Sequence, residues 1–353
     1  MKPLSFKQRI SLELYRRNKT LQRRDHVLKQ LFWECTWRCN LSCRHCGSDC
    51  KSASEVRDMP AEDFLKVIDS LRPHVDPHNV NIVITGGEPL VRKDLEVVGR
   101  ELYKRQFPWG IVTNGMLLTE QKLDSLRAAG LHNITISLDG LEESHNWMRG
   151  NPLSFARAYQ AIKNVAAVED LNFDVVTCVN RRSLNELPQI KDLLVKAGVK
   201  SWRLFTIFPS GRALKYPEFE LNDAELTQLM DFISLTRKEG RISASFCCEG
   251  FMAGYEGEVR DYFFNCQAGV SVASVLIDGS IGACPSIRAG YVQGNIYKDD
   301  FWDIWQNKYQ PYRDRSWMKR GSCSDCEFWR YCEGNGMHLR DNDGNLTHCH
   351  LLK

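Results

Sequence analysis

The feature that most constrains the fold is the regular alternation of short apolar segments with amphipathic helical patterns between residues 29 and 240. The apolar segments predict six strands, at residues 30–34, 80–85, 109–113, 133–138, 173–179 and 201–207. The helical patterns predict six helices, at residues 61–71, 92–106, 120–129, 154–168, 184–197 and 223–238. Strands that alternate with helices form a parallel sheet covered by helices, and right-handed crossovers curl such a sheet into a barrel or part of one. The sequence therefore predicts an α/β fold, and periodicity alone leaves a partial barrel and an open doubly wound sheet as alternatives.

Composition narrows the class of protein. The 47 basic and 44 acidic residues nearly balance, so charge does not indicate a nucleic-acid partner. We see no apolar targeting segment and no stretch long enough to span a bilayer, and the first ten residues are polar and basic. The 14 cysteines, without an export signal, indicate metal ligation in a reducing cytoplasm, with disulfides as the less favoured alternative.

Three cysteines lie in one loop after the first predicted strand. Cys39, Cys43 and Cys46 have the spacing C-x3-C-x2-C. A cube of iron and sulfide takes four thiolates, so three cysteines leave one iron with an open coordination position. That position can bind a second molecule. The alternatives for this triad are a zinc knuckle or a redox-active thiol pair.

Distinctive polar or glycine-rich loops follow the other predicted strands. They occupy residues 86–89, 113–115, 137–140, 177–180 and 209–212. The carboxyl ends of parallel strands share one rim of the fold, and this rim carries the active site in α/β proteins. One such loop alone is usually a turn. Five of them on the rim that also carries the cysteine triad predict a functional site there.

The cysteine triad, the Gly86-Gly87-Glu88-Pro89 loop and the loop with Ser137 and Asp139 together resemble the radical S-adenosylmethionine (radical SAM) superfamily. The resemblance implies a partial (β/α)6 barrel over residues 29–240. It also implies a 4Fe-4S cluster whose open iron chelates the amino and carboxylate groups of S-adenosylmethionine. The reduced cluster then splits the sulfonium bond, and the 5′-deoxyadenosyl radical abstracts hydrogen from an unactivated C–H bond. A reducing partner such as flavodoxin or ferredoxin would supply the electron.

The resemblance assigns contacts with the methionine part of the cofactor to the second loop of the rim. Gly86 and Gly87 lack side chains, so their backbone can approach a ligand closely. In the family this loop receives the methionine amino group, and Glu88 either accepts a hydrogen bond there or braces the loop. Asn114, which follows the third strand, is a candidate near the cofactor.

Further cofactor contacts are implied after the fourth strand. Ser137 and Asp139 lie where the family binds the ribose hydroxyls or the methionine carboxylate, although Asp139 could instead cap the next segment. Arg149 belongs to the stretch 145–150, which recurs in the same subfamily. Its guanidinium fork could pair with the methionine carboxylate, and a surface ion pair is the alternative.

The alternation of strands and helices stops after Phe246, and the rest of the chain carries a second set of cysteines. Its cysteines are Cys266, Cys284, Cys323, Cys326, Cys332 and Cys349. Their spacing resembles the SPASM extension of peptide-modifying radical SAM enzymes, which normally carries two auxiliary clusters. The last four of these cysteines predict one complete auxiliary 4Fe-4S cluster, and a structural zinc ion is the alternative.

The auxiliary cluster nearer the active site departs from the family pattern. The family has a cysteine where this chain has Gly336, so only Cys266 and Cys284 remain for that cluster. Cys247 or Cys248 could supply a third ligand. Substitutes are also available among three histidines, although each is more simply an ordinary polar residue: His338, His348 and His350. The second auxiliary cluster is therefore expected to be incomplete or absent.

These patterns divide the chain into a basic N-terminal helical extension (1–28), the barrel (29–240) and a small cysteine-rich α+β SPASM-type domain (241–353). The resemblance favours a ribosomally made peptide or protein side chain as substrate, which would be crosslinked, epimerised or oxidised. Modification of a haem precursor, maturation of a sulfatase and a non-catalytic metal-binding scaffold are the alternatives. The basic N-terminus could contact a membrane, but a helix packed on the barrel is the favoured interpretation.

Overall fold

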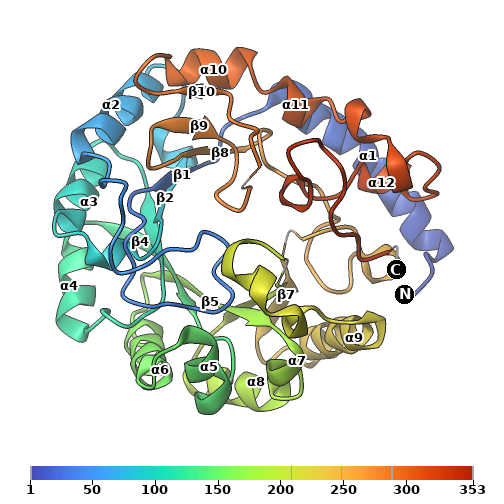
Figure 1. The fold of residues 1–353 in the computed structure, drawn as a ribbon, viewed down its shortest axis with the longest axis horizontal. Coiled ribbons are helices and arrows are strands. Elements are labelled where there is room, and N and C mark those ends of the chain that lie inside the picture. The colour runs from blue at the N-terminus through green and yellow to red at the C-terminus, as the bar shows by residue number, and fades with distance from the viewer. Residues whose placement is uncertain (1, 208, 248, 288, 352–353) are drawn as a thin grey trace.

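A computed structural model describes residues 2–207, 209–247, 249–287 and 289–351 (Figure 1). One sheet runs through the molecule, in the order β10-β9-β8-β1-β2-β3-β4-β5-β6-β7. The strands are β1 (Gln30–Glu34), β2 (Asn81–Thr85), β3 (Trp109–Thr113), β4 (Leu131–Ser137), β5 (Asn172–Val179), β6 (Ser201–Thr206), β7 (Ser243–Phe246), β8 (Val272–Val275), β9 (Ser280–Gly282) and β10 (Gly294–Asn295). Strands β1 to β7 pair in parallel in chain order, which confirms the predicted partial barrel of an α/β fold.

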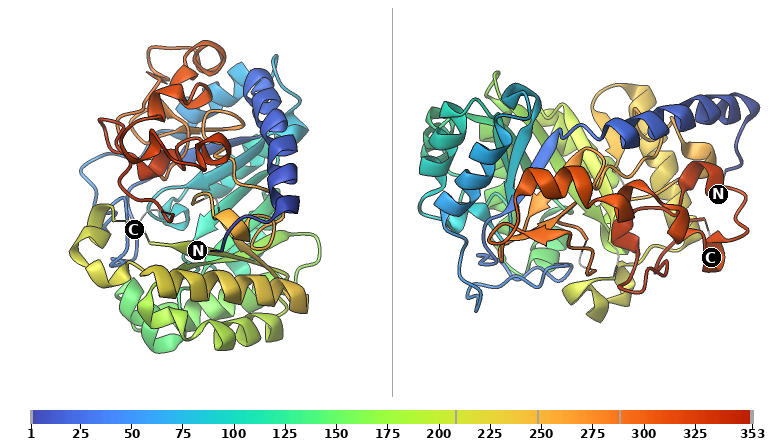
Figure 2. Two further views of the ribbon diagram at one scale, coloured as in Figure 1. Left: turned by 90° about the vertical axis from the view of Figure 1, so that its right-hand side faces the viewer. Right: turned by 90° about the horizontal axis from the view of Figure 1, so that it is seen from above.

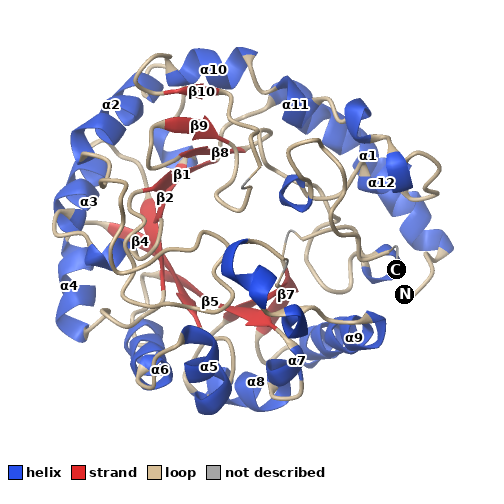
Figure 3. Cartoon of the chain, in the orientation of Figure 1, coloured by secondary structure: helices blue, strands red, loops and turns tan. Residues whose placement is uncertain are grey.

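Helices surround this sheet, and Figure 3 shows them as an outer ring with loops filling the centre. They are α1 (Phe6–Asp25), α2 (Ala61–Leu71), α3 (Leu95–Lys104), α4 (Glu120–Ala128), α5 (Glu142–Arg149), α6 (Ser154–Ala166), α7 (Arg181–Leu184), α8 (Leu187–Lys196), α9 (Asp223–Glu239), α10 (Phe301–Asn307), α11 (Gln310–Arg313) and α12 (Trp329–Cys332). None of these helices, within the part of the chain that the structure describes, combines the length and apolar character needed to cross a membrane.

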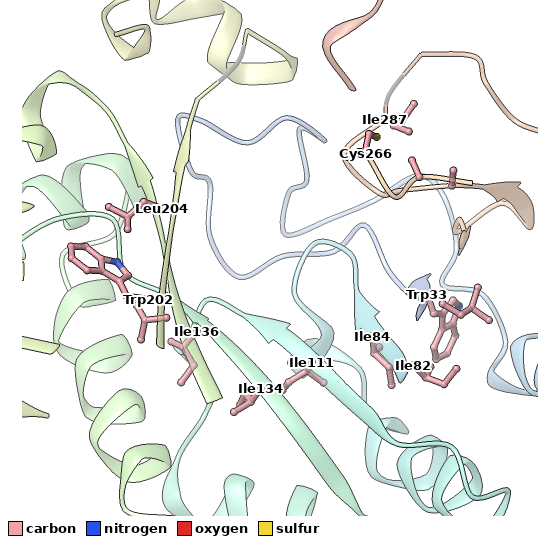
Figure 4. Close-up of a cluster of buried hydrophobic side chains, with 14 of the residues drawn as sticks. Trp33, Ile82, Ile84, Ile111, Ile134, Ile136, Trp202, Leu204, Cys266 and Ile287 are labelled. Atoms are coloured by element: carbon pink, nitrogen blue, oxygen red, sulfur yellow. The ribbon is translucent and has the colours of Figure 1, made fainter. Parts of the chain in front are cut away.

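The outward face of the barrel strands forms the core against the helices. Figure 4 shows Ile134, Ile136 and Trp202 among these buried side chains. Trp33 of β1 stacks on Phe64 of α2, with the ring centroids 4.5 Å apart. Because side chains alternate along a strand, the residues between these apolar positions face the barrel interior. The interior is therefore free to carry polar groups.

The C-terminal third continues the barrel sheet. Strand β8 pairs in parallel with β1, and β9 and β10 follow as antiparallel strands. Helix α1 lies beside the C-terminal segments, as both views in Figure 2 show. There the Lys19 ammonium donates to the Tyr331 carbonyl at 2.5 Å, and Arg23 pairs with Glu333. Residues 6–25 are therefore a packed helix, but these contacts lie on the C-terminal segments and not on the barrel against which the sequence analysis placed it.

Candidate metal and cofactor site

The cysteine triad lies in the loop that follows β1, at the carboxyl rim of the barrel. Cys39 and Cys43 are buried, and Cys46 is partly exposed. An N–H donor lies beside each of two sulfurs: the Leu41 amide nitrogen lies 3.4 Å from Cys39 Sγ, and Arg149 Nη1 lies 3.7 Å from Cys43 Sγ. Such donors stabilise thiolate ligands and tune the group that they hold.

The arrangement of the sulfurs tests whether a single ion fits them. A tetrahedral zinc ion would hold its thiolates about 3.8 Å apart, given its usual bond length to sulfur. Among the described residues, the one group of three candidate ligands whose atoms lie within 4.8 Å of one another is His45, Asp139 and Cys178. The three sulfurs of the triad therefore do not all lie within 4.8 Å of one another, and their soft donors suit a multi-iron cluster.

Cys50 contacts the triad. Its thiol donates a hydrogen bond to Cys46, and this bond, opposed by burial, lowers the pKa of Cys46 to about 5. Burial raises the pKa of Cys39 to about 12, and it also raises the pKa of Cys43 although Arg149 opposes the shift. A bound metal deprotonates its thiols whatever their free pKa. The spacing alone left Cys50 without a role, and the structure identifies it as a neighbour of the triad.

The glycine pair after β2 packs on the chain that leads into the cysteine loop. The Gly87 amide donates to the Thr36 carbonyl at 2.7 Å. A Cβ atom at Gly86 would lie 2.2 Å from the Thr36 oxygen, and one at Gly87 would lie 2.3 Å from the Arg38 oxygen. The missing side chains thus permit a close approach of two loops, in addition to the approach of a ligand that the sequence suggested.

We expect Gly86→Ala to lower the free energy of unfolding by about 1–3 kcal/mol, because the new methyl group would overlap backbone and Gly86 has a positive φ of 146°. Thermal unfolding followed by circular dichroism measures the change. Gly290→Ala is the control, since its Cβ would meet nothing closer than 3.7 Å. Equal stability of the two variants would contradict this account of the loop.

Glu88 braces the rim. Its carboxylate is buried and accepts hydrogen bonds from Thr113 Oγ1 at 2.7 Å and from the Asn114 amide at 2.8 Å. Burial raises the pKa of Glu88, although these hydrogen bonds oppose the shift. The Asn114 side chain in turn donates to Asn40 Oδ1 at 2.8 Å, inside the cysteine loop. The loops after β2 and β3 are thereby tied to the triad.

Asp139 and Arg149 form a buried ion pair beside Cys43. Arg149 Nε donates to Asp139 Oδ2 at 2.6 Å, and the Cys178 amide donates to Asp139 Oδ1 at 2.9 Å. Burial alone would raise the pKa of Asp139, but Arg149 and the nearby His45 lower it overall. The Arg149 guanidinium therefore links the loop after β4 to the cysteine triad. Ser137, the last residue of β4, is half-buried at the same rim.

We expect Asp139→Asn to lower the free energy of unfolding by about 3–5 kcal/mol at neutral pH, because it leaves the buried Arg149 charge unpaired. The carboxyl pKa is depressed in the folded state, so this contribution is present above the unfolded pKa and is lost as the pH falls below about 4. The control is Asp124→Asn, which breaks the exposed pair with Arg127 and should cost at most about 1 kcal/mol. Chemical denaturation at pH 7 compares the two, and similar losses would contradict the buried-pair account.

Two residues of this site escaped the sequence analysis. His45 and Cys178 lie with Asp139 in the compact group described above. Burial lowers the pKa of His45 to about 4, so its ring is neutral. The position of His45 between Cys43 and Cys46 was the available signal, whereas Cys178, a single cysteine in the predicted strand 173–179, gave none.

The distal C-terminal cysteines form a second group, around α12. Cys332 and Cys349 lie close enough for each thiol to affect the other electrostatically, and Cys323 joins them. Arg340 Nη2 lies 3.5 Å from Cys323 Sγ, and the Asn335 amide donates to Cys332. These donors to sulfur fit ligation of a cluster here, with the partly exposed Cys326 completing the set.

The nearer cysteines form a third group. The thiols of Cys266 and Cys247 both lie within electrostatic range of Cys284, and burial raises the pKa of Cys284 to about 11. Arg315 and the Met337 amide donate hydrogen bonds to Cys266. Cys247 therefore joins the two cysteines expected here, while Cys248 lies outside the described residues. Disulfides are absent from the cysteines that the structure describes.

Comparison with known proteins is consistent with this geometry. Residues 33–194 match the radical SAM superfamily, and residues 266–327 match SPASM, described as an iron–sulfur cluster-binding domain. AdoMet-dependent heme synthase of Methanosarcina barkeri is 28% identical over 320 residues, which cover 86% of this chain and 89% of that protein. Mycofactocin maturase MftC of Mycolicibacterium smegmatis is 29% identical over 317 residues, which cover 87% and 77%. The structure of Streptococcus suis SuiB bound to S-adenosylmethionine has the same fold, with a TM-score of 0.69 and 17% identity over 90% of this chain and 76% of that one.

Proposed function

The chain belongs to the radical SAM superfamily and carries a C-terminal SPASM domain, and we propose that it cleaves S-adenosylmethionine reductively and abstracts hydrogen from a peptide or protein side chain. The observation that carries the cleavage step is the rim triad of Cys39, Cys43 and Cys46 beside the buried Asp139–Arg149 pair. Three soft thiol donors suit a 4Fe-4S cluster with one open iron.

The residues of the rim would hold and orient the two groups. Cys39, Cys43 and Cys46 would ligate the cluster, which when reduced supplies the electron that splits the sulfonium bond of S-adenosylmethionine. Gly86, Gly87, Glu88, Asn114, Ser137, Asp139 and Arg149 would line the cofactor site. Arg149 donates toward Cys43 and would keep that ligand in place while it presents positive charge to the methionine carboxylate. Leu41 and Met116 pack beside the cysteines and would exclude water.

The distal thiols would hold one complete auxiliary 4Fe-4S cluster. Cys323 and Cys332 receive hydrogen bonds from Arg340 and the Asn335 amide, which stabilise thiolates. We assign this cluster the task of accepting the electron that remains after the substrate is oxidised. Flavodoxin or ferredoxin is the class of partner suited to reduce the rim cluster.

A peptide or protein side chain is the first candidate substrate. The mycofactocin maturase relative carries this proposal, since it is 29% identical over 87% of this chain. A haem precursor is the second candidate. The haem synthase relative favours this candidate, because the alignment covers 89% of the length of the haem synthase but 77% of the length of the maturase.

Anaerobic reconstitution with iron and sulfide, followed by dithionite and S-adenosylmethionine, tests the cleavage step. We expect release of 5′-deoxyadenosine, and its absence from iron-loaded protein would favour a non-catalytic scaffold. Addition of a peptide encoded beside the gene, or of an iron porphyrin with propionate side chains, separates the two substrates. A mass change in the peptide supports the first candidate, and loss of carbon dioxide from the porphyrin supports the second.

A further inference from the structure

The loop between Cys332 and His338 lies between the two C-terminal groups of thiols. The Asn335 amide donates to the distal Cys332, and the Met337 amide donates to the nearer Cys266. Position 336 is flanked by these two amides. A side chain at this position would therefore start between the two groups, next to the residue that contacts Cys266.

The imidazole of His338 occupies the space that a side chain at position 336 would need. A Cβ atom built on Gly336 would lie 2.6 Å from His338 Cε1 and 2.9 Å from His338 Nδ1. The short 3-10 turn Met337–Leu339 brings the ring back over the glycine. The ring nitrogen Nε2 is shielded from solvent. The ring of His338 thus fills the space that a side chain at position 336 would take.

The nearer group already supplies three thiols from three segments of the chain. Cys247 follows β7, Cys266 precedes β8, and Cys284 follows β9. Cys284 lies within electrostatic range of the other two thiols. Imidazoles do replace cysteines as ligands of iron–sulfur clusters, as on one iron of Rieske centres. Three thiols and one imidazole would complete a set of four.

We propose that His338 is a ligand of the nearer auxiliary iron–sulfur cluster, in the place of the cysteine that is absent at position 336. The cluster would then be held by Cys247, Cys266, Cys284 and His338. A neutral imidazole in place of a thiolate removes one negative charge, which favours the reduced state. This ligand set does not depend on whether the substrate is a peptide or a porphyrin. It is also tested without S-adenosylmethionine, so its failure would be distinct from a failure of the proposed cleavage.

Pulsed electron paramagnetic resonance on protein labelled with 15N-histidine tests the proposal. In the reconstituted and reduced full-length protein, without S-adenosylmethionine, we expect a strong nitrogen coupling that changes with the isotope. The coupling should be lost in His338→Ala and retained in His348→Ala, which removes a neighbouring histidine. Absence of the coupling in the wild type, or its persistence in His338→Ala, would overturn the proposal.

A double variant distinguishes the loss of a cluster ligand from a folding defect. Gly336→Cys with His338→Ala replaces the imidazole by the thiolate of the family pattern and frees the space for it. We expect this protein to hold as much iron as the wild type without the histidine coupling, whereas His338→Ala alone should lose iron. His338→Gln, which keeps a polar side chain of similar length, should also lose the coupling. If the double variant kept the histidine coupling, the proposal would be wrong.

Discussion

The Cys43→Ala variant is expected to release no detectable 5′-deoxyadenosine, whereas the wild-type protein releases it under dithionite. Cys43 is one of three thiols at the rim, and Arg149 donates toward its sulfur. With two cysteines the loop cannot hold a four-iron cluster with one open corner, so about four irons per chain should be lost. Liquid chromatography of the nucleoside products and an iron assay on the same sample measure both effects.

Two cysteine variants serve as controls for this result. Cys35→Ala removes a fully buried cysteine of the chain just after β1 and should keep iron and cleavage. Cys50→Ala removes the thiol that donates to Cys46 and should also retain the cluster, because Cys50 is not among the three proposed ligands. Cleavage that survived in Cys43→Ala but disappeared in Cys50→Ala would show that the ligands had been assigned wrongly.

The Cys326→Ala variant is expected to cleave S-adenosylmethionine at close to the wild-type rate. It should nevertheless form modified substrate at less than about a hundredth of the wild-type rate, which corresponds to an activation free energy higher by at least about 3 kcal/mol. Cys326 belongs to the distal set, which is separate from the rim triad. Loss of the distal cluster removes the proposed acceptor for the substrate electron. The ratio of 5′-deoxyadenosine to modified substrate, with the peptide or porphyrin that proves active, measures this uncoupling.

Ser324→Ala is the matched control in the same loop, since the Ser324 hydroxyl donates to the Gly321 carbonyl and not to a sulfur. It should leave the product ratio unchanged. Normal product formation by Cys326→Ala would contradict a redox role for the distal cluster and leave it a structural part of the SPASM domain.

The barrel could be predicted because its strands are short, apolar and regularly followed by helices. Strands β1 and β3 have the predicted bounds, β2, β5 and β6 differ by one residue at one end, and β4 starts two residues earlier and ends one residue earlier than predicted. The predicted helix at 184–197 corresponds to α8, which begins only at Leu187, because Pro188 suits the first turn of a helix. Strands β7 to β10 were not predicted, since they have two to four residues and include serine or glycine.

The candidate site was predictable where chemistry depends on spacing along the chain. Cysteine triads and glycine pairs are local patterns, so the sequence located the rim loops. The partners within the site depend on how distant loops pack. The salt bridge between Arg149 and Asp139 and the contact between Cys50 and Cys46 required the structure. The overlap of His338 with the space beside Gly336 likewise follows from the turn that carries both residues.

The open corner of the rim cluster is tested most directly by electron paramagnetic resonance of the reduced protein before and after addition of S-adenosylmethionine. To remove the signals of both auxiliary clusters, the experiment uses a variant in which Cys266, Cys284, Cys323, Cys326 and Cys332 are replaced by alanine, alongside the wild type. The account predicts that S-adenosylmethionine changes the g values of the cluster held by Cys39, Cys43 and Cys46. An iron signal that the nucleoside leaves unchanged, in both proteins, would contradict it.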